Sequence, residues 1–316
     1  MTIRYIAASR SSKLALKQTE IVLNALTKLH TGDQFHIVPI KTVGDIDKRP
    51  LFSMDRKGLF EKEVNDSVLN GQADFGVHSL KDIPTDLHPD LLIASVPKRA
   101  DPHDALVSKN KINLRNLSKG SKVGTSSLRR AIQIKQKNSA VEVIPIRGNV
   151  ETRINKSLDG LFDAVVLAQA GLARLGLEHT IVERFSIRDF LPAPGQGAIA
   201  IVCRRDNKSI VSLLQEIEHL PSRKSIDAER ALIKGINTGC RFPVGVLANY
   251  DRESKTIRLR AKAFSVDGKK SLRVEKIGKS SKAKEIGDAA AQWFIRNGIE
   301  EIAHGWRDAL NSWNKI

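Results

Sequence analysis

The sequence is poor in aromatic residues and cysteines, and it has no long apolar run. Aromatic residues make up only 5% of the 316 positions, which argues against reading single-stranded nucleic acid by base stacking. No window approaches the roughly 18 uninterrupted apolar residues of a membrane-spanning helix, so we expect no membrane span. The N-terminal stretch MTIRYIAASRSSK is broken by Arg4 and Arg10 and lacks the apolar core of a secretory signal.

The two cysteines, Cys203 and Cys240, lie in unlike contexts and do not suggest a disulfide framework. We therefore expect a cytoplasmic protein with reduced thiols. Cys203 belongs to the apolar run AIAIVCR, which favours a filling role in a core. Cys240 belongs to INTGCRFPVG, where a glycine precedes it and Pro243 follows closely, so this thiol is expected in an irregular loop.

Acidic residues are too few to balance the basic ones, and the formal net charge is +17. Residues 219–316 hold 20 Lys and Arg against 11 Asp and Glu, an excess of nine. Such a charge fits a solvated basic surface, nucleic acid, an anionic membrane or a polyanionic small molecule. The basic runs KTIRLRAKAF and KIGKSSKAK lack aromatic stacking platforms, which disfavours sequence-specific nucleic-acid binding.

Short β-branched runs alternate with amphipathic stretches of helical length through the first two thirds of the chain. This alternation predicts βαβ units and largely parallel sheets. The stretch KRADPHDA (98–105) is expected to cross to a second α/β domain, and AIAIVCR (198–204) to return to the first. From about residue 219 the pattern changes to helix, loop, three strands and one long C-terminal helix, AKEIGDAAAQWFIRNGIEEIAHGW.

We therefore predict an α/β protein with two doubly wound domains, of the kind found in periplasmic binding proteins, around a cleft. A smaller α+β domain completes the chain. The predicted domains are residues 1–98 with 198–217, residues 99–197, and residues 218–316 with the Cys240 loop. No metal site is expected, since His78 is isolated and favours a structural role.

Polar and basic side chains follow the predicted strands of both α/β domains, at the ends where such sheets bind ligands. Helix N-termini and guanidinium groups together suit carboxylates or phosphates. Taken singly, Ser127 fits a helix N-cap and each arginine a solvated position. Taken together they predict a polyanionic ligand between the two domains. These residues are Arg10, Ser11, Ser12, Lys81, Asp82, Thr125, Ser126, Ser127, Arg129, Arg130, Arg147, Arg153 and Arg174.

The residues quoted so far carry a resemblance to the porphobilinogen deaminase (hydroxymethylbilane synthase) family along the whole chain. The matching stretches are SRSSKLALKQ (9–18), KGLFEKE (57–63), DFGVHSLKDIPT (74–85), VGTSSLRRAIQ (123–133), IRGNVETRI (146–154), LAQAGLARLG (167–176), PAPGQGAIAI (192–201) and NTGCRFPVG (237–245). The resemblance implies a transferase of heme and tetrapyrrole biosynthesis. Four porphobilinogen molecules are condensed with loss of ammonia on a dipyrromethane primer, and the linear tetrapyrrole hydroxymethylbilane is then released by hydrolysis.

The resemblance also implies roles for individual residues. Cys240 corresponds to the anchor of the single dipyrromethane cofactor, held through a thioether, and neighbouring Arg241 would favour the reactive thiolate. Asp82 corresponds to the catalytic carboxylate, which would stabilise the cationic azafulvene left by ammonia loss and move protons. On the sequence alone, Asp82 fits a turn ahead of Pro84 equally well.

The remaining implied contacts are polar and mostly basic, as a ligand rich in acetate and propionate groups requires. The guanidinium groups of Arg129 and Arg130 are expected to face the ligand rather than the core. Replacing either residue should therefore barely change thermal stability. The implied cofactor-binding residues are Lys81, Asp82, Thr125, Ser127, Arg129, Arg130, Arg147 and Gly148. The implied substrate-binding residues are Arg10, Ser12, Gln18, Lys57, Arg147, Arg153 and Arg174.

Porphobilinogen is then the expected partner, with no nucleic acid, no membrane and no obligate protein partner, in a monomer. Two other readings stay open on the residues alone. A solute-binding or ligand-sensing protein also has two α/β domains around a cleft, but would need no anchoring cysteine. A nucleic-acid binder is suggested by charge only.

Overall fold

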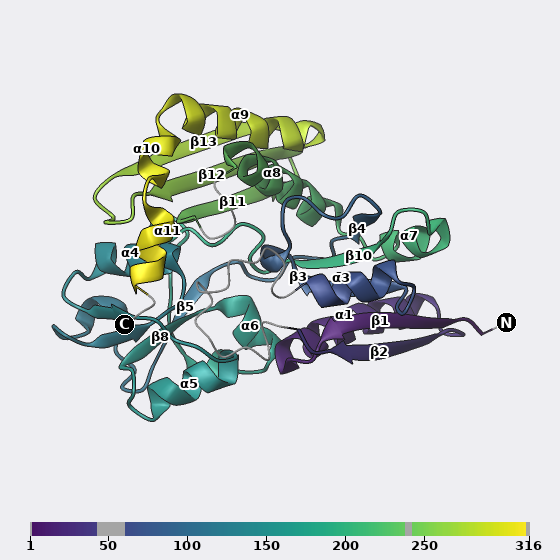
Figure 1. The fold of residues 1–316 in the computed structure, drawn as a ribbon, viewed down its shortest axis with the longest axis horizontal. Helices are drawn as coiled ribbons and strands as arrows, with labels where there is room; N and C mark the ends of the chain where they lie inside the picture. The colour runs from purple at the N-terminus through teal and green to yellow at the C-terminus, as the bar shows by residue number, and fades with distance from the viewer. Residues whose placement is uncertain (1, 43–60, 238–241, 314–316) are drawn as a thin grey trace. The chain divides into compact units, whose positions relative to one another are not determined.

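The computed structural model describes residues 2–42, 61–237 and 242–313. They form two compact units, one of Met1–Ala100 with Gly197–Arg223 and one of Asp101–Gln196 with Lys224–Ile316 (Figure 1). The second unit contains most of the residues of the second and third predicted domains, and the three-domain division remains a prediction. Across the described residues, no helix is both long enough and apolar enough to span a membrane.

The first unit is built on a five-stranded sheet of order β2-β1-β3-β10-β4. Strand β1 pairs in parallel with β2 and β3, whereas β10 runs antiparallel between β3 and β4. Buried residues of α1, β3 and β10, such as Leu26, Phe75 and Ile201, share one core. Its elements are β1 (Arg4–Arg10), α1 (Lys13–Leu29), β2 (Gln34–Ile40), α3 (Lys62–Leu69), β3 (Phe75–Ser79), the 3-10 helix η2 (Leu80–Asp82), β4 (Leu91–Ser95), β10 (Ile199–Arg204) and α7 (Lys208–Gln215).

The second unit contains a sheet with the same plan, of order β7-β6-β8-β5-β9. Strand β6 pairs in parallel with β7 and β8, and β5 runs antiparallel between β8 and β9. All five residues of β5 are buried, so both faces of this strand are covered. The elements are β5 (Asp104–Ser108), β6 (Lys122–Gly124), α4 (Leu128–Lys137), β7 (Glu142–Ile144), α5 (Val150–Leu158), β8 (Ala164–Ala168), α6 (Gln169–Arg174) and β9 (Ile181–Arg184), with short 3-10 turns η3 (Leu114–Asn116) and η4 (Glu178–Thr180).

The predicted α/β class is confirmed, but the prediction of largely parallel sheets is wrong in part. Each sheet is mixed, because one central strand comes from a segment outside its run of βαβ units. The return of residues 198–204 to the first sheet is confirmed by the pairing of β10 with β3 and β4. The segment 98–105 is not only a crossover, since β5 begins at Asp104.

The rest of the second unit is an antiparallel sheet of order β11-β12-β13 with helices α8 and α9 packed on it (Figure 1). Leu232 of α8, Leu259 of β12 and Phe294 of α9 belong to its core. The elements are α8 (Leu220–Ile236), β11 (Val244–Asp251), β12 (Thr256–Phe264), β13 (Ser271–Lys279), the turn η5 (Ser280–Lys282), α9 (Ala283–Arg296), α10 (Ile299–Ala303) and α11 (Trp306–Trp313). This sheet and its helices confirm the predicted smaller α+β part.

The single long C-terminal helix predicted from the sequence is wrong, because the segment is divided into α9, α10 and α11. The first break falls at Gly298, whose φ of 83° lies in the left-handed region that glycine adopts without strain. A second left-handed glycine, Gly305 with φ 71°, stands immediately before α11.

Candidate functional site

In the first unit, the predicted site residues lie at the carboxyl ends of β1 and β3. Arg10 is the last residue of β1, and Ser12 caps α1 by accepting a hydrogen bond from the backbone N–H of Ala15 at 3.4 Å. Gln18 is buried on α1, and its side-chain amide exchanges hydrogen bonds with the hydroxyl of Ser79 at 2.9 and 3.1 Å. This contact fixes the start of α1 against the end of β3.

Lys81 and Asp82 lie on η2, directly after β3, and both are exposed. The residues on either side, Leu80 and Ile83, are 2% and 4% exposed. The backbone N–H of Leu80 donates to the carbonyl of Ala198 at 3.0 Å, which ties the turn to the start of β10. Because the apolar neighbours are held in the core, the short turn presents Lys81 and Asp82 to solvent.

His78 lies in β3 and is buried, as its predicted structural role requires. Burial, with a smaller contribution from Arg10, lowers the pKa of this imidazole to about 3. The side chain is therefore neutral at ordinary pH and is a poor proton carrier. Within the described residues, no group of three or more His, Cys, Asp and Glu side chains could hold a metal ion.

In the second unit, Thr125 and Ser127 shape the turn between β6 and α4. The backbone N–H of Thr125 donates to the carbonyl of Ile144 at 3.0 Å, and its hydroxyl accepts from the N–H of Ser127 at 3.2 Å. Ser127 caps α4, since its hydroxyl accepts from the N–H of Arg130 at 3.4 Å. The simple structural role predicted for Ser127 is thereby confirmed, and a ligand contact for it remains a prediction.

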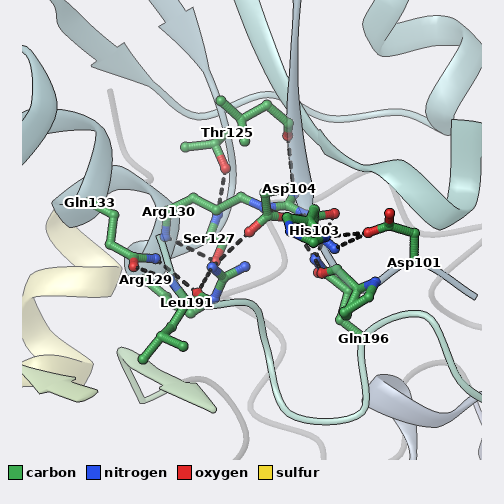
Figure 2. A network of polar contacts seen from close by, with 12 residues as sticks. Asp101, His103, Asp104, Thr125, Ser127, Arg129, Arg130, Gln133, Leu191 and Gln196 are labelled. Atoms are coloured by element: carbon green, nitrogen blue, oxygen red, sulfur yellow. Dashed lines mark hydrogen bonds and ion pairs between the residues drawn. The ribbon is translucent and has the colours of Figure 1, made fainter. Parts of the chain in front are cut away.

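Arg129 and Arg130, the next residues of α4, are buried and bind one carboxylate (Figure 2). Arg129 Nη1 lies 2.8 Å from Asp104 Oδ2, and Arg130 Nη2 lies 2.7 Å from Asp104 Oδ1. Arg130 Nε adds a further hydrogen bond to Oδ1 at 3.0 Å. Burial alone would raise the pKa of Asp104, but the two guanidinium groups outweigh it and hold the pKa at about 2.

Loop residues complete this arrangement, which we call the Asp104 network (Asp104, Arg129, Arg130, Leu191 and Gln196). The carbonyl of Leu191 accepts from Arg129 Nη1 at 2.6 Å, and Gln196 Nε2 donates to Asp104 Oδ1 at 2.9 Å (Figure 2). Gln196 Nε2 also donates to the carbonyl of Pro102 at 2.7 Å. The network therefore holds the stretch PAPGQG against the start of β5.

The expectation that Arg129 and Arg130 face a ligand rather than the core requires correction. Both guanidinium groups are directed at buried Asp104, so both residues support the fold whatever else they bind. Sequence reasoning overlooked Asp104, Leu191 and Gln196 as members of this network. The available signal was an aspartate at the head of the apolar run DALVS, since a buried acid needs cationic partners.

Arg147, Arg153 and Arg174 are half-buried and lie after β7, in α5 and in α6. The pKa of Arg153 is lowered to about 10 by burial, by Arg130 and by Arg147, so Arg153 lies close enough to Arg130 and Arg147 to be repelled by both. Burial lowers the pKa of Arg174 to about 10 as well. Half-buried cations under such repulsion form a favourable site for anions.

Gly148 holds Arg153 in place. Arg153 Nε donates to the Gly148 carbonyl at 2.8 Å. Gly148 has φ 119°, and a Cβ there would lie 2.6 Å from Thr152 Cγ2. Only glycine fits this backbone and this close approach to α5.

Two of the predicted site residues, Cys240 and Lys57, lie outside the described residues, as does Arg241. The other cysteine, Cys203, is fully buried in β10, and the prediction of a filling role is confirmed. Burial, together with Asp206, raises the pKa of the Cys203 thiol to about 11. This cysteine is therefore a weak nucleophile near neutral pH.

Solved structures similar to this chain include ligand-binding proteins. The methionine-binding protein MetQ aligns with a TM-score of 0.43 and 15% identity, covering 70% of this chain and 90% of that one. The effector-binding domain of BenM with benzoate aligns with a TM-score of 0.42 and 12% identity, covering 68% of this chain and 89% of that one. These TM-scores are too low to support an argument about function.

Sequence relatives cover nearly the whole chain. A probable porphobilinogen deaminase of Nitrosopumilus maritimus is 44% identical over 313 residues, 99% of this chain and 100% of that protein. A probable porphobilinogen deaminase of Methanothermobacter thermautotrophicus is 41% identical over 91% of this chain and 98% of its own length. A porphobilinogen deaminase of Roseiflexus castenholzii is 40% identical over 94% of this chain and 97% of its own length.

Family models give the same result and add the cofactor. Residues 5–212 match the model described as "Porphobilinogen deaminase, dipyromethane cofactor binding domain", and residues 224–295 match "Porphobilinogen deaminase, C-terminal domain". The two matches together span both units of the structure. The chain belongs to the porphobilinogen deaminase family.

Proposed function

We propose that this protein condenses four porphobilinogen molecules, one at a time, on a single dipyrromethane primer bound to Cys240 and then releases hydroxymethylbilane. The observation that supports this best is the group of half-buried arginines in the second unit, Arg147, Arg153 and Arg174. Both primer and substrate carry acetate and propionate groups. A chain with a dipyrromethane-binding domain needs cations that can reach such carboxylates.

The described residues fit the cofactor by their chemistry. The repulsion that lowers the pKa of Arg153 would be relieved by a carboxylate bound among Arg130, Arg147 and Arg153. Thr125, Ser127, Gly148 and Lys81 add hydroxyl, backbone and ammonium donors suited to the same groups. When bound, the primer supplies the pyrrole that is extended.

The protein's own groups then have separate tasks. Arg147, Arg153 and Arg174 of the second unit would bind carboxylates of the growing chain, and Arg10, Ser12, Gln18 and Lys57 those of the incoming porphobilinogen. The Gln18 side chain also bonds to the Ser79 hydroxyl, so besides its proposed contact with the substrate it would orient the start of α1 against the end of β3. Arg129 and Arg130 would position the loop of Leu191 and Gln196 through Asp104.

Asp82 is the proposed catalytic residue. Loss of ammonia from porphobilinogen leaves positive charge on the pyrrole, and a fixed carboxylate stabilises that charge where it develops. Asp82 is exposed on a turn held by buried neighbours, so its carboxylate is accessible to substrate while its backbone is fixed. The same carboxylate can accept the proton released when the new bond forms.

We further propose that the enzyme is a cytoplasmic monomer with porphobilinogen as its small-molecule substrate and no obligate protein, nucleic-acid or membrane partner. This part rests on the family resemblance and on the two unlike cysteine contexts. Size-exclusion chromatography with light scattering tests it, and a stable dimer would contradict it.

Intact-mass measurement tests the anchor. Wild-type protein should exceed its sequence mass by two linked pyrrole units and give an Ehrlich-type colour, and Cys240→Ser should lose both, together with all activity, because a serine hydroxyl is a far weaker nucleophile. The matched control Cys203→Ser should keep the mass increment at a cost of about 1–3 kcal/mol in stability. An increment that survives in Cys240→Ser would contradict the proposal.

A second pair of variants tests the catalytic carboxylate. Asp82→Asn should keep the mass increment and lose turnover by about 100–1000-fold, since one preorganised group is worth about 3–4 kcal/mol in the transition state. Asp86→Asn removes an exposed charge from the same loop and should stay near wild type. Near-normal turnover in Asp82→Asn would rule out this assignment.

A further inference from the structure

A second group of basic side chains lies in the second unit, around a pocket that shares Leu191 with the Asp104 network. It is a pocket of about 380 Å³ formed by α4, the loop after β9 and strands β12 and β13. None of its lining residues belongs to the predicted cofactor or substrate set. We call it the polybasic pocket, lined by Arg115, Gln133, Gln136, Lys137, Arg188, Asp189, Leu191, Lys262 and Arg273.

The pocket has five cations and one acid. The cations come from five separate segments of the chain: Arg115 from η3, Lys137 from α4, Arg188 from the loop, Lys262 from β12 and Arg273 from β13. No ion pair within 4.0 Å joins any of them to a carboxylate of the described residues. Asp189, the acid in the lining, acts on Lys262 only at longer range.

The strand register makes this arrangement unusual within its own sheet. Lys262 lies directly opposite Arg273 across β12 and β13, and like charges in such a pair destabilise a sheet. One step along the same face, Arg260 lies opposite Glu275 and binds it at 2.9 Å. The sheet therefore neutralises one cross-strand pair and leaves the pair at the pocket repulsive.

Lys262 is held at the pocket although its charge is disfavoured there. Its ammonium lies 4.9 Å from the ring centroid of Phe264, and burial together with Arg273 lowers its pKa. The floor below it is fixed, because the Gln133 side chain accepts from the N–H of Leu191 at 2.8 Å and donates to its carbonyl at 3.1 Å. An anion bound here would relieve the repulsion without displacing existing bonds.

We propose that the polybasic pocket binds a compact polyanion carrying two or more phosphate or carboxylate groups. Its volume lies at the small end for small-molecule sites, which favours a compact ligand over a complete tetrapyrrole. Among the residues that line it there is no aromatic side chain, so a nucleobase has no stacking platform. The site accounts for part of the net charge of +17, which porphobilinogen binding alone does not require, and it stands independently of the proposed function.

The test uses the cofactor-loaded enzyme and two probe anions, pyrophosphate and citrate, at constant ionic strength set with NaCl. Isothermal titration calorimetry and thermal unfolding are run on the wild type, on K262Q/R273Q and on the control K276Q/K279Q. The control removes the same charge from β13 outside the pocket. We expect at least one anion to bind the wild type and the control and to raise their thermal midpoint, and K262Q/R273Q to bind at least tenfold more weakly.

Other outcomes are equally decisive. Tight binding of pyrophosphate alone would identify a phosphate ligand, and tight binding of citrate alone would identify a polycarboxylate. Both results support an anion site in the polybasic pocket. No binding of either anion above the NaCl background would overturn it. Equal binding by K262Q/R273Q, with loss of binding in Arg153→Leu, would overturn it by assigning the anion to the arginines of the candidate active site.

Folding of the variant is not expected to obscure the result. Replacing Lys262 and Arg273 removes a repulsive pair, so the ligand-free double variant should unfold at or above the wild-type temperature. If it unfolds lower, Lys137→Gln, at the C-terminal end of α4, replaces it with the same expected loss of anion affinity.

Discussion

Two groups of arginines in the second unit differ in their surroundings, although the sequence predicts that both contact anionic ligands, one the cofactor and the other the substrate. Arg129 and Arg130 are buried and share one buried carboxylate, Asp104. Arg153 and Arg174 are half-buried, and the influences that lower their pKa are burial and, for Arg153, other cations. Asp104 neutralises the first group, whereas an anion bound at the second group would oppose the influences that lower its pKa.

The difference shows that position after a strand does not settle the role of an arginine. A buried guanidinium group is tolerated only where a counter-charge and hydrogen bonds compensate its lost hydration. Asp104, Gln196 and the Leu191 carbonyl provide that compensation for one group. The following predictions test whether the two groups really divide into structural and ligand-binding arginines.

The largest effect is expected from Asp104→Asn. The change is nearly isosteric but leaves two buried guanidinium groups without a carboxylate, which should cost about 3–5 kcal/mol of the free energy of unfolding. Urea unfolding and the thermal midpoint of the purified variant measure it. If the free energy of unfolding of Asp104→Asn equalled that of the wild type within experimental error, Arg129 and Arg130 could not be called structural arginines.

Arg153→Leu and Arg174→Leu should behave oppositely, with a loss in function and little loss in stability. Each removes a charge-assisted contact worth about 1.5–3 kcal/mol, so porphobilinogen turnover at low substrate should fall by about 10–100-fold. The thermal midpoint should stay close to that of wild type. A marked loss of stability with normal turnover would transfer these arginines to the structural group.

The pH dependence of stability should separate the groups as well. The pKa of Asp104 is about 2 in the folded protein against an ordinary 3.8. An acid whose pKa is lower in the folded state contributes its full stabilisation at any pH above its pKa in the unfolded state. That contribution is lost as the pH falls through its pKa in the folded state. The stability gap between wild type and Asp104→Asn should therefore be constant above about pH 4 and narrow below it. Urea unfolding at a series of pH values measures the gap, and a gap that widened on acidification would contradict the assignment.

The smallest effect is expected at an exposed arginine–aspartate pair near the same strand. Arg184 Nη2 lies 2.6 Å from Asp101 Oδ2, with 51% and 30% of the two side chains exposed, against 0% for Asp104. Arg184→Gln should cost only about 0.2–1 kcal/mol, because solvent screens this pair. A loss as large as that of Asp104→Asn would show that burial is not what distinguishes the pairs.

Much of the fold could be predicted from local patterns. The stretch LRRAIQIKQK has apolar residues at helical spacing and forms α4, and Ser127 caps this helix as predicted. The β12 and β13 strands and the return of β10 were also anticipated. These features depend on periodicity and capping, which neighbouring residues determine.

The features that were missed depend on distant residues. The antiparallel pairing of β5 with β8 joins residues 56 to 64 positions apart, and Asp104 bonds to Gln196, 92 positions away. No local pattern encodes either contact. The predicted C-terminal helix is too long, because Gly298 and Gly305 adopt left-handed φ values at the points where the helix breaks. In the candidate site, residue type and place predict the arginines, but their division into two groups depends on the position of Asp104.

The insertion of β10 between β3 and β4 has a consequence for the order in which the protein assembles during synthesis. The sheet of β5 to β9 is encoded entirely by residues 104–184, so all its strands are available once that segment leaves the ribosome. The N-terminal sheet, although its first strands are made earlier, lacks a central strand until residues 199–204 appear. Until then β3 and β4 present unpaired edges that are open to aggregation or to chaperones. The part of the chain that is translated first is therefore the later of the two sheets to close.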